Sequence, residues 1–346
     1  MRKLIACLSV IAVLGSTAIT SAIAAPARDS LTLVGAGSTF DAPFFTQAFD
    51  SYHTKYGTTV NYQAIGSGGG IKAFTTKTVD FGASDVPMNP VTELPFAVSS
   101  GGPVLQVPIT IGGVSVAYNI PGVKTGLHLT GAVLAQIFLG TVKMWNDKAI
   151  KSLNPKVKLP ASQITVVHRS DSSGTSYIFT DYLAQVSAQW RGGVGVGKLP
   201  NWPAGVGGSG NPGVAQLVQS TPDSIGYVEL AYVLQNHMKQ AALENKKKQW
   251  EVPNLKTVAA AAAALPHVTA TDFSIVNAPG KLAYPIAGYS WVLLYQHPSD
   301  ATKGKDLAKL FTWTATTGQK FAKALDYVPL PANIQKLDVT TLKKIK

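Results

Sequence analysis

Short apolar runs and segments of helical apolar spacing alternate along the chain. Residues 31–34 alternate in character and predict a short strand, and a glycine-rich turn separates them from residues 42–56, where apolar side chains recur three or four positions apart. Residues 58–65 and 79–83 are rich in β-branched and aromatic side chains, which predicts two more strands, with a short helix over 71–76 between them. Strands that alternate with helices predict an α/β fold with mostly parallel sheets.

The same alternation continues through the middle of the chain. Residues 130–139 predict a helix, and residues 164–167 predict a strand that precedes a helix over 177–185. Residues 224–230 predict a further strand. Residues 192–213 are so dense in glycine that they cannot form a long regular element, so we expect either a mobile loop or a cover over a ligand cleft.

Two apolar runs predict strands that cross between two lobes. They lie near residues 109–117 and 284–294 and divide the chain into an outer part and an insert. We therefore expect a first lobe from residues 25–110 and 284–346 and an inserted second lobe from residues 111–283. A cleft between two lobes is a common place for a small ligand.

The first residues have the pattern of a secretory signal peptide. A positively charged start is followed by an apolar stretch over 4–20 and by an A-x-A cleavage pattern at 22–24. We expect residues 1–24 to be removed. The only cysteine, Cys7, precedes the apolar run instead of following it, so we expect no lipid anchor, and the mature chain would contain no disulfide.

Composition and charge exclude several classes of protein. Hydrophobic residues make up 46% of the 346 residues and charged residues 14%, which is typical of a folded chain. The net charge of +12 is spread out, and its densest cluster, residues 246–248, lies beside Glu244 and Glu251, so we expect a solvated loop and no nucleic-acid partner. The six histidines have no metal-binding spacing, so we expect no metal and no cofactor.

Three turns rich in glycine or hydroxyl groups connect a predicted strand to a predicted helix. They are residues 35–40, 66–70 and 169–176. The first N–H groups of a helix lack internal partners and lie at the positive end of its dipole, so such turns can bind anions. Arg169 adds a guanidinium whose geometry matches a tetrahedral oxyanion. A dinucleotide site is disfavoured because residue 40 is Phe, so the full G-x-G-x-x-G pattern is absent.

Asp85 lies at the end of a predicted strand, which is where α/β sheets place ligands. Its carboxylate would influence which anion the site binds. A carboxylate repels a fully deprotonated anion but accepts a hydrogen bond from one that retains a proton. Phosphate near neutral pH retains a proton and sulfate does not, so an Asp85 that faces the anion would favour phosphate by roughly 2–5 kcal/mol. The candidate ligand-binding residues are Thr39, Phe40, Ser67, Asp85, Arg169, Ser173, Gly174 and Thr175.

The motifs, in their order along the chain, resemble those of the periplasmic phosphate-binding proteins of ABC transporters, the PstS family. The resemblance implies a type II periplasmic binding fold, in which two α/β lobes joined by two hinge strands close on one phosphate ion. The segments that carry it are Gly-Ala-Gly-Ser-Thr-Phe at 35–40, Ile-Gly-Ser-Gly-Gly-Gly at 65–70, Asp-Phe-Gly-Ala-Ser-Asp at 80–85, Trp-Asn-Asp-Lys-Ala-Ile at 145–150, Arg-Ser-Asp-Ser-Ser-Gly-Thr-Ser at 169–176 and Ile-Gly-Tyr-Val-Glu at 225–229.

The resemblance also implies a role for each candidate residue. Thr39 and Phe40 would bind through backbone and hydroxyl groups, and Ser67 through its hydroxyl and N–H. Asp85 would accept the phosphate proton. Asp171 would pair with the arginine and restrain its charge. Ser38 and Gly68 stand where other members carry different small residues. The ligands from the second lobe would be Arg169, Ser173, Gly174 and Thr175.

The function implied by the resemblance is non-catalytic. A monomer in the periplasm would capture inorganic phosphate by hinge closure and deliver it to a PstC/PstA-type ABC permease with its ATPase. Four alternatives remain at this point. The chain could bind another oxyanion such as sulfate or molybdate, act as a phosphatase, or serve a sensory or adhesive role. It could also be a hydrolase that uses Ser173, His168 and Asp171 as a triad, although no G-x-S-x-G motif encloses the serine.

Overall fold

Three parallel strands near the start of the chain bring the first two glycine-rich turns to one edge of a curled sheet. In the computed structural model, which describes residues 31–346, β1 (Thr32–Gly37) lies between β2 (Thr59–Ala64) and β3 (Phe81–Ser84) and pairs with both in parallel. The segments after these strands therefore meet at the same edge. The predicted signal peptide, residues 1–24, lies outside the described residues.

The first two helices differ in how well the sequence predicts them. Helix α1 (Ala42–Tyr56) has the predicted bounds, because its apolar residues lie on one face and are buried. Helix α2 (Ser67–Thr75) begins four residues earlier than predicted, because the glycines that resemble a loop form its first turn. A Cβ on Gly70 would lie 2.6 Å from the carbonyl oxygen of Ala36, so this glycine lets the helix pack closely on the sheet.

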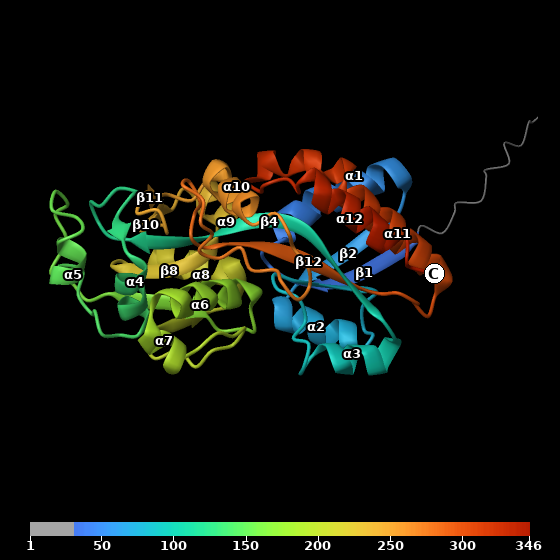
Figure 1. Cartoon of the computed structure of the whole chain (residues 1–346), viewed down its shortest axis with the longest axis horizontal. Helices are drawn as coiled ribbons and strands as arrows, with labels where there is room; N and C mark the ends of the chain where they lie inside the picture. The colour runs from blue at the N-terminus through green and yellow to red at the C-terminus, as the bar shows by residue number, and fades with distance from the viewer. Residues whose placement is uncertain (1–30) are drawn as a thin grey trace, which may run out of the picture. The chain divides into compact units, whose positions relative to one another are not determined.

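Two strands run side by side through the sheet, as predicted for the crossing strands (Figure 1). Strand β4 (Val104–Asn119) pairs with β12 (Ala287–Tyr295) in antiparallel fashion as far as Gly113. From Val114 onward β4 pairs with β8 (Ser224–Glu229), so the same strand belongs to both halves of the sheet. The lobe boundaries near residues 110 and 284 remain a prediction.

The second half of the sheet continues from β8 through β6 (Thr165–Arg169) to β7 (Val206–Gly208), and all three pair in parallel. Strand β6 thus ends at Arg169, which places the arginine at the sheet edge. The helices of this half are α4 (Gly131–Phe138), α5 (Lys148–Lys151), α6 (Gly174–Val186), α7 (Ala188–Gly192), α8 (Gly210–Ser220), α9 (Leu230–Gln235) and α10 (Leu255–Ala264).

Several elements lack a sequence signal strong enough to predict them. Strands of two or three residues show no periodicity, and α12 buries only three side chains.

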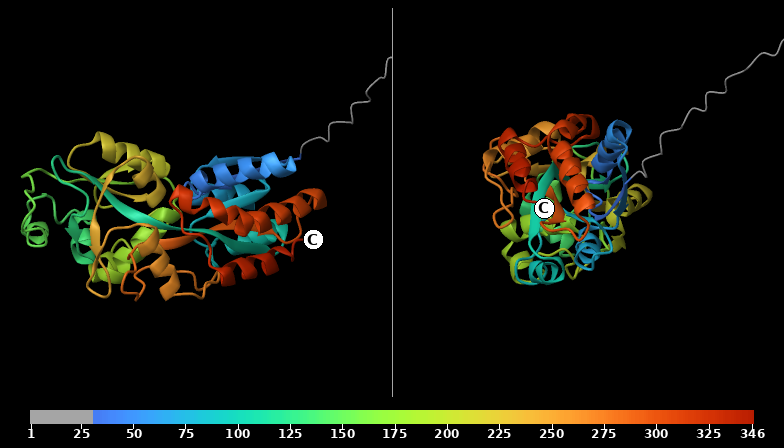
Figure 2. Two further views of the ribbon diagram at one scale, coloured as in Figure 1. Left: turned by 90° about the horizontal axis from the view of Figure 1, so that it is seen from above. Right: turned by 90° about the vertical axis from the view of Figure 1, so that its right-hand side faces the viewer.

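Helices α11 and α12 lie side by side (Figure 2). None of the helices in residues 31–346 is long and apolar enough to cross a membrane. The remaining elements are α3 (Leu94–Gly101), β5 (His128–Leu129), β9 (Lys239–Gln240), β10 (Ala242–Glu244), β11 (Trp250–Glu251), α11 (Ala301–Ala315), α12 (Ala332–Leu342) and the 3-10 helices Thr317–Phe321 and Lys323–Leu325.

Candidate anion-binding site

The predicted turns meet where the two halves of the sheet face each other. The hydroxyl oxygen of Ser67 accepts hydrogen bonds from the backbone N–H of Asp85 at 3.2 Å and of Gly174 at 3.0 Å. The hydroxyl of Thr175 donates to Asp85 Oδ2 at 3.1 Å. Residues 67 and 85 belong to the first half and residues 174 and 175 to the second, so groups of both halves are in direct contact. All eight predicted binding residues are buried.

Arg169 is held in place by Asp171. Its Nε donates to Asp171 Oδ1 at 2.7 Å and its Nη2 to Asp171 Oδ2 at 2.5 Å. Burial opposes the charge of Asp171, but the hydrogen bonds and positive charge of Arg169 outweigh it and lower the pKa of this carboxyl below its usual value. The Nη1 atom lies 3.4 Å from the Thr175 hydroxyl, which keeps one edge of the guanidinium at the site.

The N-cap residue Ser173 and the buried side chain of Tyr227 stabilise the start of α6. Ser173 is the N-cap, and its Oγ accepts from the backbone N–H of Ser176 at 3.1 Å. The Tyr227 hydroxyl accepts from the backbone N–H of Arg169 at 3.0 Å and lies 2.6 Å from the Ser176 hydroxyl. The tyrosine ring stacks on Phe179 in the core, with centroids 4.3 Å apart. Packing of the second half therefore fixes both the arginine and the helix N-terminus.

Asp85 is surrounded by hydroxyl groups. Ser38 and Ser290 donate to its Oδ1, the latter at 3.0 Å, and Thr175 donates to Oδ2. Burial raises the pKa of Asp85, while the Ser38 hydrogen bond and the charge of Arg169 act to lower it. Ser38 also accepts from the backbone N–H of Phe40 at 2.8 Å. Ser38 is thus bonded to two of the predicted ligands, Phe40 and Asp85.

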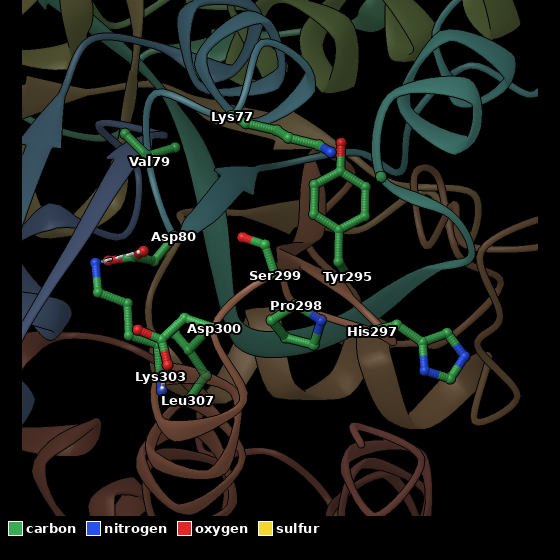
Figure 3. Close-up of a pocket in the computed structure, with 11 residues that line it drawn as sticks. Lys77, Val79, Asp80, Tyr295, His297, Pro298, Ser299, Asp300, Lys303 and Leu307 are labelled. Carbon is green, nitrogen blue, oxygen red and sulfur yellow. Dashed lines mark hydrogen bonds and ion pairs between the residues drawn. The ribbon is translucent and has the colours of Figure 1, made fainter.

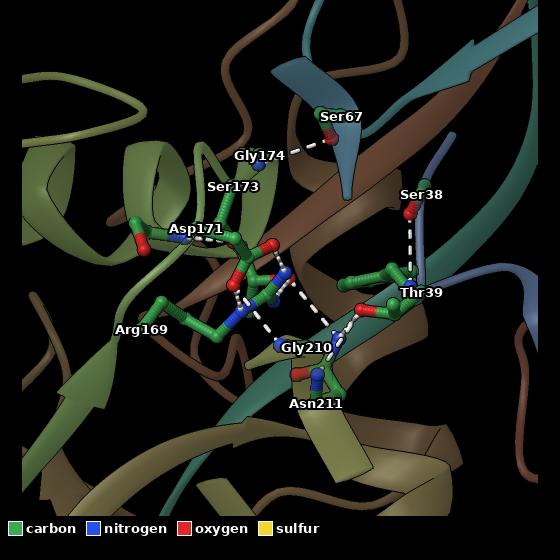
Figure 4. A network of polar contacts seen from close by, with 12 residues as sticks. Ser38, Thr39, Ser67, Arg169, Asp171, Ser173, Gly174, Gly210 and Asn211 are labelled. Carbon is green, nitrogen blue, oxygen red and sulfur yellow. Dashed lines mark hydrogen bonds and ion pairs between the residues drawn. The ribbon is translucent and has the colours of Figure 1, made fainter. Parts of the chain in front are cut away.

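Asn211, which the sequence reasoning missed, completes the contact between the halves (Figure 4). Its backbone N–H and its Nδ2 donate to Thr39 Oγ1 at 3.1 and 3.0 Å, and Nδ2 also lies 3.2 Å from Thr175 Oγ1. The neighbouring Gly210 has a φ of +67° and donates its N–H to Asp171 Oδ1 at 3.0 Å. The end of the glycine-rich segment 192–213 therefore forms the start of α8 and lies against the site.

The residues of the alternative hydrolase triad do not form a chain of hydrogen bonds. His168 Nδ1 lies 3.0 Å from the carbonyl oxygen of Arg169, and the imidazole stacks on Trp202. Ser173 caps its helix and Asp171 pairs with the arginine. A serine hydrolase needs a base bonded to the nucleophile and an acid bonded to the base. This arrangement contains neither contact.

A second pocket lies away from this site, beside β12 and the start of α11 (Figure 3). It has a volume of about 140 Å³. Of its two carboxylates, Asp80 pairs with Lys303 Nζ at 2.9 Å and accepts from the backbone N–H of Val34 at 2.8 Å, and Asp300 caps the start of α11. In residues 31–346, no group of three or more His, Cys, Asp and Glu side chains is placed to hold a metal ion.

Fold and site together define a two-lobed binding protein that places hydroxyl groups, backbone N–H groups and one arginine between its lobes. The chain matches the PBP superfamily domain over residues 20–316. It is 45% identical over 310 residues to the phosphate-binding protein PstS of Xylella fastidiosa, which covers 89% of this chain and 84% of that protein. It is 41% identical over 321 residues to PstS of Haemophilus influenzae, with 92% and 93% covered.

The chain therefore belongs to the PstS family, whose members are binding proteins and not enzymes. Among solved structures, it is similar to the periplasmic phosphate-binding protein PfluDING bound with phosphate, with a TM-score of 0.71. Identity is 22%, and 89% of this chain and 92% of the other are covered, so this similarity establishes the fold alone. The predicted α/β binding-protein fold is confirmed.

Proposed function

We propose that this protein captures inorganic phosphate outside the cytoplasm and delivers it to an ABC permease for import. The observation that carries the proposal is the contact of the Thr175 hydroxyl with both Arg169 and the buried carboxylate of Asp85. Beside it, Ser67 Oγ accepts from the backbone N–H groups of Gly174 and Asp85. Any oxyanion can accept hydrogen bonds from the N–H, hydroxyl and guanidinium groups. An oxyanion that retains a proton can also donate a hydrogen bond to the Asp85 carboxylate. The relatives named above are phosphate-binding proteins, which supports the same ligand.

The proposed ligand set draws on both halves of the protein. Backbone N–H groups at the starts of α2 and α6 and the guanidinium supply positive potential, and serine and threonine hydroxyls supply donors of adjustable direction. Closure around the anion would then replace contacts between these groups with contacts to phosphate. The proposed ligands are Thr39, Phe40, Ser67, Asp85, Arg169, Ser173, Gly174 and Thr175, with Asp171 holding the arginine.

The location and partners of the protein form part of this proposal. Residues 1–24 would be cleaved without a lipid anchor, and the mature protein would act as a periplasmic monomer. One lobe would comprise residues 25–110 and 284–346, and the other would comprise residues 111–283. Strands β4 and β12 would join the two lobes. The loaded form would dock on a PstC/PstA-type permease.

The Asp85→Asn substitution tests the discrimination between phosphate and sulfate. An amide at this position can donate a hydrogen bond to a fully deprotonated anion, which the carboxylate repels. The phosphate-to-sulfate affinity ratio should fall by at least about 30-fold, the equivalent of 2 kcal/mol. Calorimetric titration of wild type and variant with both anions measures this ratio.

Asp80→Asn is the matched control, because Asp80 pairs with Lys303 away from the site. It should leave the ratio unchanged. Retained selectivity in Asp85→Asn would show that the carboxylate does not face the anion. Absence of phosphate binding by the wild-type protein, or tight binding of sulfate, would overturn the proposed function itself.

A second prediction concerns an ion pair between the halves. Lys198 Nζ lies 2.5 Å from Glu93 Oε1, and the backbone carbonyl of Lys198 accepts from the N–H of Ser173 at 2.8 Å. The pair connects the glycine-rich segment to the start of α3, so it should slow the opening that releases the anion. Since partly exposed pairs contribute about 1 kcal/mol, Lys198→Met should speed phosphate release about 3- to 5-fold in stopped-flow measurements.

Lys309→Met provides the control, because the Lys309–Asp306 pair lies within α11. It should leave the release rate as it is. If Lys198→Met instead slowed phosphate association and left release unchanged, the ion pair would act in capture and not in retention.

A further inference from the structure

A second buried carboxyl, Asp41, lies behind Asp85. It is fully buried and bonds to two hydroxyl groups: Thr110 Oγ1 donates to its Oδ1 at 3.0 Å, and Ser290 Oγ lies 2.7 Å from its Oδ2. The same Ser290 oxygen lies 3.0 Å from Asp85 Oδ1. One serine hydroxyl thus bridges two carboxyl groups, one of which belongs to the proposed site.

A single hydroxyl cannot satisfy two carboxylates. It has one proton and can donate to only one acceptor at a time. If Asp41 and Asp85 were both ionised, two like charges would lie in a buried environment. Asp41 Oδ2 would also have no donor whenever Ser290 donates to Asp85, whereas Asp85 Oδ1 keeps the Ser38 donor in either case. Both effects favour retention of a proton by the pair.

The surroundings decide which carboxyl holds that proton. Asp85 accepts from Ser38, Ser290 and Thr175 and is close enough to Arg169 for that charge to lower its pKa. Among the described residues, no lysine, arginine or histidine bonds to Asp41. Burial raises the pKa of Asp41 well above its usual value, and the negative charge of Asp85 raises it further.

The other titratable groups around this carboxyl pair are Glu229 and three phenols, and none of them donates to Asp41. Burial raises the pKa of Glu229 well above its usual value, and the charge of Asp85 raises it further, so Glu229 supplies no positive charge to either aspartate. The hydroxyl of Tyr62 donates to the carbonyl oxygen of Ser38 at 2.7 Å. Those of Tyr232 and Tyr327 donate to the carbonyl oxygens of the next two residues, 39 and 40, at 2.7 and 2.6 Å. These phenols fix the backbone after β1 but leave the charge of Asp41 without compensation.

We propose that Asp41 retains its proton and donates it to Ser290 Oγ, which directs the proton of Ser290 toward Asp85. Asp85 then stays ionised as the acceptor for the phosphate proton, so Asp41 is a positioning residue for anion selectivity. If Asp41 were ionised, Ser290 would donate to the nearer carboxylate, and Asp85 would lose a donor and gain a repulsive neighbour. The consequence for selectivity rests on the proposed function, whereas the protonation state does not.

Carboxyl carbon NMR of the mature protein labelled at aspartate measures the protonation state directly. At pH 7, the spectrum should contain a signal from a protonated aspartic acid that disappears in Asp41→Asn and persists in Asp85→Asn. The proposal is wrong if the Asp41 signal is that of a carboxylate at pH 7, or if the signal disappears only in Asp85→Asn. This result does not depend on phosphate binding, so it remains informative if the proposed function fails.

Two substitutions of Asp41 test its positioning role. An asparagine can donate from Nδ2 to Ser290 and accept from Thr110 through Oδ1, as a protonated aspartic acid does, whereas an isosteric leucine can do neither. The phosphate-to-sulfate affinity ratio of Asp41→Asn should therefore exceed that of Asp41→Leu by at least about 10-fold, because the leucine leaves Ser290 free to reorient. Equal loss in both variants would overturn the positioning role. If the leucine variant does not fold, the test rests on Asp41→Asn alone. A phosphate-to-sulfate affinity ratio like that of wild type, with the same dependence on pH, supports the positioning role, and loss of this selectivity overturns it.

Discussion

A Gly174→Ala variant should fold like the wild type but bind phosphate at least about 100-fold more weakly, since overpacking at this contact costs about 3 kcal/mol. A Cβ on Gly174 would lie 2.6 Å from Asp85 Cβ, 2.7 Å from Ser67 Oγ and 2.8 Å from the backbone nitrogen of Asp85. Backbone cannot move aside as a flexible side chain can. The two halves of the site would have to separate, and the ligands on one side would no longer reach an anion bound on the other.

The fold of the second half should tolerate the added methyl group. Gly174 is the first residue of α6, and alanine favours a helix more than glycine does. The clash therefore falls on the contact between the halves and not on the helix. Calorimetry with phosphate measures the affinity, and thermal unfolding without phosphate measures stability.

Gly192→Ala is the matched control, because a Cβ on this helical glycine would meet nothing within 4 Å. It should bind phosphate with wild-type affinity. Affinity within about 3-fold of wild type in Gly174→Ala, under 1 kcal/mol, would show that the halves do not approach this closely around the anion.

Local sequence predicted much of this site because several of its groups are neighbours along the chain. Arg169 and Asp171 are two positions apart and form their ion pair within one turn. Ser173 caps the helix that immediately follows it. Patterns of apolar residues also predicted α1 and the long strand β4, because one face of the helix and nearly all of the strand are buried.

The missed residues depend on contacts between distant parts of the chain. Asn211 bonds to Thr39 across 172 positions, and Ser290 bonds to Asp41 across 249 positions. Nothing in the neighbouring sequence of either residue indicates its partner. Asp41 follows a glycine-rich turn, where an aspartate is common as a helix cap, and only the fold shows that its side chain makes no cap and points into the core.

An Asp338→Leu substitution should stabilise the protein, and more so at alkaline pH. Asp338 lies on the buried face of α12, and within residues 31–346 neither of its carboxyl oxygens has a hydrogen-bond partner. Burial raises its pKa from 3.8 to about 8. The folded protein therefore holds a proton that the unfolded chain releases between about pH 4 and pH 8, so stability falls as the pH rises through this range.

Above pH 8 the folded protein carries an uncompensated buried charge, and the loss of folding free energy reaches at most about 6 kcal/mol. Leucine has the same number of side-chain heavy atoms as aspartate and removes both the charge and the unpaired oxygens. Relative to wild type, the free energy of unfolding of Asp338→Leu should rise by about 3 kcal/mol or more at pH 9 and by clearly less at pH 5. The exposed Asp50 on α1 supplies the control, since Asp50→Leu should produce no such pH dependence. An equal gain at both pH values would show that Asp338 does not change its protonation state between pH 5 and pH 9.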